Sequence, residues 1–84
     1  MREKHVKKSV VMPQMGMTMR EGTICKWLAQ EGSVVKKGFP LLEVEIDKGI
    51  VEIECPATGT LTRKLKREGE VVLVGQAIGW IEEA

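Results

Sequence analysis

The sequence contains two copies of one stretch, GTICKWLAQEGSVVKKGFPLLEVE at residues 22–45 and GTLTRKLKREGEVVLVGQAIGWIE at residues 59–82. The copies are offset by 37 residues, and nine of the 24 aligned pairs are identical. Chance would give about two identities for a composition this rich in Gly, Val, Glu and Lys. A solenoid needs more than two repeats. The duplication therefore predicts two halves that share one core and are related by a pseudo-two-fold axis.

Each copy predicts short β-strands separated by glycine turns. Apolar and polar residues alternate most clearly around Leu42, Val44 and Ile46, which share one face, and no stretch sustains helical periodicity. We therefore expect an all-β fold: a flattened β-barrel or sandwich of two four-stranded antiparallel sheets with internal pseudo-two-fold symmetry. The expected strands lie near residues 9–12, 22–29, 33–36, 40–46, 50–55, 59–66, 70–74 and 77–83.

One irregularity recurs in both copies. The alternation falters between Ile24 and Leu28, and again between Leu61 and Leu65, where the apolar residues are four positions apart. We expect a β-bulge or a strand bend at both places.

A methionine-rich segment, Pro13–Glu21, has no counterpart of equal length in the second copy. We therefore expect an exposed loop there. Because methionine commonly fills gaps in a core, Met12 and Met15 are expected to cap the barrel, while Met17 and Met19 are expected to be incidental.

Length and composition exclude several classes of function. The 84 residues suffice for one small domain, and 13 Lys plus Arg against 12 Asp plus Glu leave it near neutral. With only Trp27, Phe39 and Trp80 as aromatic residues, the surface offers neither the charge nor the rings that nucleic-acid binding uses. We expect a monomer that binds neither nucleic acid nor membrane, with residues 1–8 as a flexible basic tail and residues 9–84 as the folded domain.

Residues suited to catalysis or metal binding are sparse. Cys25 and Cys55 lack metal-ligand spacing, so we expect small apolar residues in a reducing compartment, with a disulfide or reactive thiol as the alternative. His5 lies in the tail, and no serine or cysteine has a base beside it. Four acidic residues alternate outward on strands and predict a solvated face that could steer a basic partner. They are Glu43, Glu45, Glu52 and Glu54.

Between the copies, two alternating strands are joined through Asp47-Lys48-Gly49, which predicts a hairpin. This suits a three-residue connection in which Asp47 and Lys48 form a type I turn and Gly49 adopts a positive φ as a bulge. Lys48 should then project into water, with Ile46 and Ile50 anchoring the strands below it. Adding the repeat offset to Lys48 leads just past the end of the chain, so this tip should lie opposite the two termini.

These elements together resemble the lipoyl domains of 2-oxo acid dehydrogenase complexes, over nearly the whole chain from Val10 to Glu82. The attachment motif of that family usually reads Glu-Thr-Asp-Lys-Ala, and here it reads Glu-Ile-Asp-Lys-Gly at residues 45–49. Ile46 thus replaces a threonine and Gly49 an alanine, which could change how a ligase or partner enzyme reads the turn. The other matching segments, in the order and spacing of the family, lie at residues 11–16, 21–24, 27–28, 31–32, 35, 38, 41–45, 56–59 and 68–69.

The resemblance implies a carrier domain that is not itself an enzyme. A lipoate ligase or lipoyl transferase would join lipoic acid to Lys48, and Asp47 and Gly49 would shape the turn. The arm would serve a thiamine-dependent 2-oxo acid dehydrogenase (E1), an acyltransferase core (E2) and dihydrolipoamide dehydrogenase (E3). The expected compartment is the cytoplasm of a bacterium or archaeon, or the mitochondrial matrix. The Met15–Glu21 loop is expected to lie near the tip.

Three alternatives stay open beside this interpretation. A biotin carrier domain shares the fold, but normally sets its lysine between two methionines, whereas Asp47 and Gly49 flank Lys48 here. A glycine-cleavage carrier protein also bears lipoate but is longer. An unmodified barrel could serve as an assembly or efflux-adaptor module, with the turn merely connecting strands.

Overall fold

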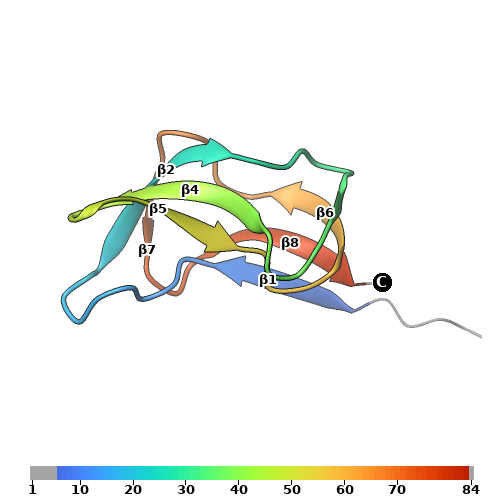
Figure 1. The fold of residues 1–84 in the computed structure, drawn as a ribbon, viewed down its shortest axis with the longest axis horizontal. Helices are drawn as coiled ribbons and strands as arrows, with labels where there is room; N and C mark the ends of the chain where they lie inside the picture. Colours follow the sequence, from blue (N-terminus) through green and yellow to red (C-terminus); the bar gives the residue numbers. More distant parts are fainter. Residues whose placement is uncertain (1–5, 84) are drawn as a thin grey trace, which may run out of the picture.

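The computed structural model describes residues 6–83, and every element of regular structure in them is a β-strand (Figure 1). The strands form two four-stranded antiparallel sheets, one in the order β1-β8-β6-β3 and the other in the order β5-β4-β2-β7. This architecture confirms the all-β, two-sheet prediction. The strands are β1 (Lys7–Val11), β2 (Glu21–Trp27), β3 (Val34–Val35), β4 (Pro40–Ile46), β5 (Gly49–Glu54), β6 (Gly59–Lys64), β7 (Val71–Leu73) and β8 (Ala77–Glu83).

The two sheets are related by the predicted pseudo-two-fold symmetry. β1, β8, β6 and β3 occupy the places in one sheet that β5, β4, β2 and β7 occupy in the other. The hydrogen bonds repeat with the same relation: the Gly32 amide donates to the Leu61 carbonyl at 2.7 Å, and the Gly69 amide donates to the Ile24 carbonyl at 2.7 Å. The sequence repeat is therefore also a repeat of backbone hydrogen bonding, and each half donates an equivalent bond to the other half.

Both copies contain the predicted irregularity. In the pairing of β2 with β4 the register shifts between Ile24 and Lys26, and in the pairing of β6 with β8 it shifts between Leu61 and Arg63. A shift of this kind bends the strand and increases its twist. The two bulges thus help to curve the flat sheets around a shared core.

The inner faces of the two sheets enclose one apolar core, and no polar or charged side chain among residues 6–83 is buried in it. Leu42, Leu61 and Val72 are fully buried, as the alternation along their strands requires. The other buried residues are Val10, Met12, Ile24, Trp27, Val35, Leu41, Val44, Ile53, Cys55, Ala57, Ile78 and Ile81.

Strand ends differ from the expected ones by up to a few residues. β1 begins at Lys7 and not at residue 9, because Lys7 and Lys8 pair with Glu82 and Ile81 of β8. The expected tail of residues 1–8 therefore overlaps β1 by two residues, and residues 1–5, which include His5, lie outside the described part of the chain. β3 has only two residues, and it lies at the edge of its sheet, where it pairs with β6.

Candidate functional site

The β4–β5 hairpin ends in the turn that carries Lys48. Ile46 and Gly49 are the last paired residues, so the connection is the two residues Asp47 and Lys48. The expected three-residue connection is wrong, because Gly49 pairs with Ile46 as the first residue of β5 without a shift of register. Gly49 has a φ of +130°, and no other residue type in the described chain has a positive φ. The structure thus confirms the positive φ expected at Gly49, and negative φ values at Asp47 and Lys48 agree with the type I turn.

The two isoleucines beside the turn face different surroundings. Ile46 is half-buried and packs against the core, as expected. Ile50 is 63% exposed, so its expected anchoring role is wrong. The reason is the register: Ile50 is the cross-strand partner of Glu45, and directly opposed residues share one face of a sheet. Glu45 faces water, and Ile50 therefore does too.

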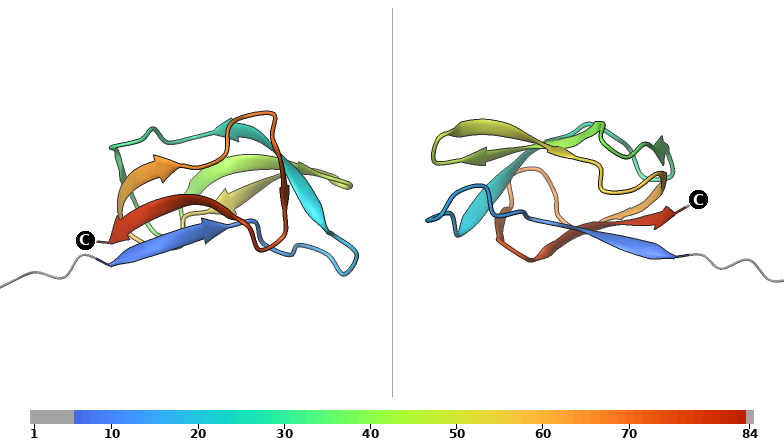
Figure 2. Two further views of the ribbon diagram at one scale, coloured as in Figure 1. Left: turned by 180° about the vertical axis from the view of Figure 1, so that it is seen from behind. Right: turned by 60° about the horizontal axis from the view of Figure 1, so that its bottom comes forward.

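The turn lies at the opposite end of the domain from the chain ends that the structure describes. Figure 1 places the β4–β5 tip at one end and the C-terminal end of β8 at the other, and both views in Figure 2 agree. β1 begins beside the end of β8, where Lys7 pairs with Glu82. The predicted separation of Lys48 from the termini is confirmed for residues 6–83.

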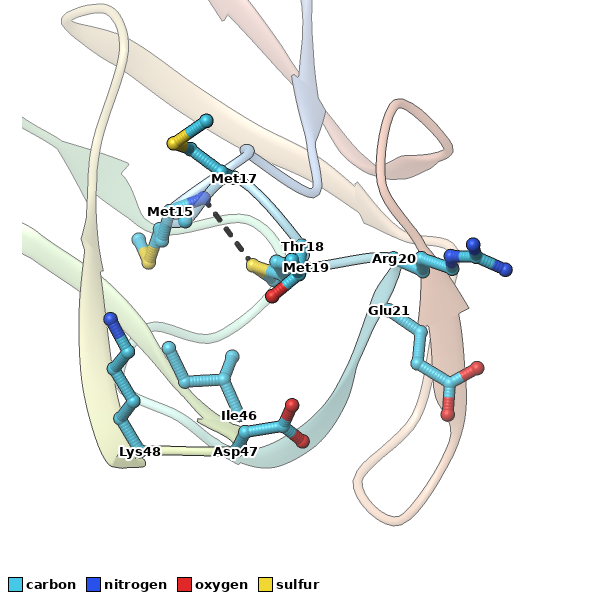
Figure 3. Close-up of a pocket in the computed structure, with 10 residues that line it drawn as sticks. Met15, Met17, Thr18, Met19, Arg20, Glu21, Ile46, Asp47 and Lys48 are labelled. Atoms are coloured by element: carbon cyan, nitrogen blue, oxygen red, sulfur yellow. Dashed lines mark hydrogen bonds between the residues drawn. The ribbon is translucent and has the colours of Figure 1, made fainter.

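A cavity of about 310 Å³ lies at this tip, between the turn and the loop that joins β1 to β2 (Figure 3). Lys48 forms part of its wall, and Ile46 points into it from the end of β4. The expected proximity of the Met15–Glu21 loop to the tip is therefore confirmed. The cavity is lined by Met15, Gly16, Met17, Thr18, Met19, Arg20, Glu21, Ile46, Asp47 and Lys48.

Within residues 6–83, the Lys48 ammonium makes no hydrogen bond or ion pair. The side chain is exposed, and Figure 3 shows its amine extending from the turn toward the side of the cavity where Met15 lies. An amine that another protein must acylate needs this access. The arrangement therefore fits a covalent attachment site.

The loop opposite Lys48 is held by its own hydrogen bonds. The Gln14 side-chain amide donates to the carbonyl of Gly16 and, at 3.0 Å, to the carbonyl of Met19. The Met15 amide donates to the Met19 Sδ at 3.3 Å, and the Met19 amide donates to the Gly16 carbonyl at 3.2 Å. Sequence reasoning missed Gln14, because a polar residue in an expected loop carries no signal of its own.

The methionines do not divide as expected. Met12 is 1% exposed and fills the core, which confirms its role. Met19 is half-buried against the core, whereas Met15 is 37% exposed, so the expected roles of these two are wrong. The Met15 amide donates to the Met19 sulfur, so the two side chains belong to one hydrogen-bonded loop. Met17 is 99% exposed, in line with its incidental role.

The four acidic residues of the hairpin lie on the outer face of the β5-β4-β2-β7 sheet. Glu45, Glu52 and Glu54 are exposed and Glu43 is half-buried. Glu43 faces Glu52 across the strand pair, an arrangement that like charges disfavour. The opposite neighbour of Glu43 is Lys26 of β2, which offsets part of that repulsion. The expected solvated face is confirmed.

The remaining expectations about reactive groups concern cysteines and metals. Cys25 is half-buried, Cys55 is buried, and both are free thiols, as expected. Over the described residues, no group of three His, Cys, Asp or Glu side chains could hold a metal ion. That part of the chain also contains no helix long and apolar enough to span a membrane.

Comparison with known families places the chain. The family of biotin and lipoyl domains, described as biotin-requiring enzyme, matches residues 8–81. The chain belongs to this family. The sequence resemblance to lipoyl domains is thus confirmed at the level of the whole domain.

Relatives of this biotin/lipoyl domain are acyltransferase components of several complexes. It is 41% identical over 75 residues to the dihydrolipoyllysine-residue acetyltransferase component of the acetoin cleaving system of Cupriavidus necator. It is 46% identical over 76 residues to the dihydrolipoyllysine-residue acetyltransferase component of the pyruvate dehydrogenase complex of Zymomonas mobilis. The chain is covered to 89% in both matches but spans only 20% and 17% of those relatives.

A solved lipoyl domain has the same fold. The lipoyl domain of the 2-oxoglutarate dehydrogenase complex from Azotobacter vinelandii is similar with a TM-score of 0.71 and 26% identity, covering 90% of this chain and 95% of that one. The chain is a lipoyl domain, a carrier module of acyltransferase components that is not catalytic by itself.

Proposed function

We propose that Lys48 is the attachment site for lipoic acid and that the domain carries acyl groups and electrons between the enzymes of a 2-oxo acid dehydrogenase complex. The observation that carries the proposal is the free, exposed Lys48 amine at the tip of a tight hairpin in a lipoyl domain. Asp47 and Gly49 flank it, and neither is the methionine that flanks the lysine of biotin carriers.

Each residue of the turn has a distinct part in this function. Lys48 would supply the nucleophile: its Nζ attacks the carbonyl carbon of the lipoyl adenylate that a ligase makes from lipoate and ATP. The amide C–N bond forms, the C–O bond to AMP breaks, and the nitrogen loses a proton. Asp47 and Gly49 fix the place at which a ligase meets that amine. The bound group supplies a dithiolane that accepts an acyl group and two electrons.

The domain contributes tethering and recognition to the carrier cycle. A tethered arm reaches roughly millimolar effective concentration at each active site that it can span. Its partners would be a lipoate ligase or lipoyl transferase, then an E1 dehydrogenase, an E2 acyltransferase core and an E3 dihydrolipoamide dehydrogenase. The relatives act in complexes for different substrates, so the E1 partner would determine the acyl group. The two free thiols suit a reducing compartment, the cytoplasm or the mitochondrial matrix.

The test is modification of the purified domain by a lipoate ligase with lipoate and ATP, followed by intact mass and peptide mapping. We expect one lipoyl adduct on the peptide that contains Lys48, and none in Lys48→Arg. Lys37→Arg is the matched control, because Lys37 also precedes a glycine with positive φ in an exposed turn. This control should be modified as the parent is.

The other outcomes each overturn the proposal. An adduct on a different lysine would remove Lys48 from its role. Biotin added by a biotin ligase, with no lipoate added, would make the chain a biotin carrier. No adduct from either ligase would favour an unmodified interaction module.

A further inference from the structure

The cavity at the tip differs from an ordinary gap between loops, because the proposed acceptor lysine is part of its wall. Its volume of about 310 Å³ lies at the lower end of the range for small-molecule sites, roughly 300–1,000 Å³. Met15 and Met19 line it from the β1–β2 loop, and Ile46 lines it from the end of β4. We call these three side chains the methionine seat.

The methionine seat is formed before any arm is attached. The Gln14 side chain spans the loop by donating to the carbonyls of Gly16 and Met19, and the Met19 sulfur accepts from the Met15 amide. The Val74 amide donates to the Arg20 carbonyl at 2.9 Å and ties the end of the loop to the β7 side of the sheet. The loop therefore holds its shape without a ligand.

The chemistry of the seat suits an alkyl chain. Thioethers and a branched aliphatic group contribute no hydrogen-bond donor, and methionine adapts its shape to what it contacts. An ammonium gains little from these three side chains, and its favourable partners are water and the carboxylates of Glu21 and Asp47, which also line the cavity. Acylation removes that charge and places a row of methylenes within reach of the cavity, and these gain by leaving water.

We propose that the methionine seat holds the alkyl part of the acyl arm on Lys48 in a resting position, an inference that rests on the proposed function. Ile46 contacts the methylenes of the arm nearest to residue 48, and Met15 and Met19 cover the arm from the β1–β2 loop. Met15 is 37% exposed, so the seat is shallow and the arm can leave it when a partner enzyme binds. Gln14 acts as a positioning residue, because it holds the loop and does not line the cavity.

The test uses an arm that needs no ligase. In the double variant Lys48→Cys, Cys25→Ala, residue 48 carries the reactive thiol, because Cys55 is 3% exposed. Octyl methanethiosulfonate then attaches an eight-carbon chain, and methyl methanethiosulfonate gives the matched short adduct. NMR spectra then record the ¹³C-labelled methionine methyl groups and their nuclear Overhauser contacts with the attached alkyl group.

We expect Met15 and Met19 methyl signals to shift further with the octyl adduct than with the methyl adduct, and to show contacts with chain methylenes. Met12 serves as an internal control, because it is 1% exposed in the core and does not line the cavity. The same octyl chain on Lys37→Cys, Cys25→Ala should leave Met15 and Met19 unshifted. Octyl shifts no larger than the methyl shifts, with no contacts, would overturn the seat.

A second variant tests the positioning role. Gln14→Glu keeps the shape of the side chain but removes both donated hydrogen bonds. It should weaken the contacts of the octyl chain with Met15 and Met19 at least severalfold, while amide spectra of the sheets stay unchanged. Contacts as strong as in the parent would remove Gln14 from this role.

The two proposals fail separately. Loss of lipoylation at Lys48, measured by mass, would overturn the proposed function even if the octyl chain sits in the seat. A lipoylated domain whose arm shows no contact with Met15 or Met19 would overturn the seat and leave the carrier function standing.

Discussion

Gly49 holds a backbone conformation that an L-amino acid with a side chain rarely adopts. Its φ of +130° is the largest positive value in the described chain, while the space around a Cβ at this position is open. The obstacle to substitution is therefore the backbone and not a neighbour. A lipoyl domain with the more common alanine here must hold the residue at another φ, so glycine sets the local path of this turn.

Gly49→Ala should lower the free energy of unfolding by about 1–3 kcal/mol, the usual cost of a strained backbone conformation. Guanidinium denaturation followed by tryptophan fluorescence measures it. Gly16→Ala is the matched control, because Gly16 also has open space around its Cβ but no positive φ, and it should be neutral or slightly stabilising. Equal stability of the two variants would show that the turn tolerates alanine.

At the residue scale, the sequence predicts the hairpin turn that carries Lys48 but not the surroundings of that side chain. Asp47-Lys48-Gly49 between alternating strands is a local signal, and local signals survive folding. The exposed position of Ile50 follows from the alternation of its own strand, which groups it with Glu52 and Glu54, so the expected anchoring role overlooked a pattern that the sequence contains. Met19 lies in an irregular loop, and no periodicity describes its half-buried position.

At the element scale, the two bulges are each covered by a glutamate from the other half. The Trp27 amide donates to Glu68 Oε2 at 3.1 Å, and the Lys64 amide donates to Glu31 Oε2 at 2.6 Å. Trp27 and Lys64, like Glu31 and Glu68, are related by the repeat offset. The same structural role therefore explains why both copies have a glutamate at this position: each carboxylate accepts a hydrogen bond from a backbone amide near a bulge.

The two symmetric contacts should differ in their contribution to stability. The contact of Trp27 with Glu68 is partly buried, whereas that of Lys64 with Glu31 is exposed. Glu68→Ala should cost about 1–3 kcal/mol, because it leaves a partly buried donor without a partner. Glu31→Ala should cost less than about 1 kcal/mol, because water can replace the carboxylate.

Urea denaturation of both variants, followed by the fluorescence of Trp27 and Trp80, measures this difference. Equal losses would mean that burial does not distinguish the two sites. A larger loss for Glu31→Ala would contradict the argument.

At the scale of the whole molecule, the sequence repeat predicts the sheets, their symmetry and the position of Lys48 opposite the chain ends. These are properties of topology, which a duplicated pattern specifies. The short β3 and the early start of β1 are not predicted, because strand ends depend on which neighbours remain available for pairing. The long β1–β2 loop breaks the symmetry, and it does so at the tip that carries Lys48.

The symmetry predicts that the domain tolerates circular permutation. Lys7 pairs with Glu82, and the Glu83 amide donates to the Val6 carbonyl at 2.8 Å, so the ends meet as Ile46 and Gly49 meet at the tip. A two-residue Asn-Gly link from Glu83 to Val6 would form a second hairpin turn. Opening the chain between Lys48 and Gly49 should then give a permuted domain that folds, since ends that lie close together tolerate this change.

Circular dichroism, amide spectra and urea denaturation would compare this permuted domain with one that has the same link but is opened between Gly32 and Ser33. We expect the first to unfold cooperatively and the second to be clearly less stable. The Gly32 amide and the Ser33 carbonyl both bond to Leu61 of the other half, at 2.7 and 3.0 Å, so that break disturbs the closure between halves. If the domain opened at Lys48 were the less stable of the two, the β4–β5 tip would contribute to the stability of the fold. The prediction that the fold does not depend on an intact tip would then be wrong.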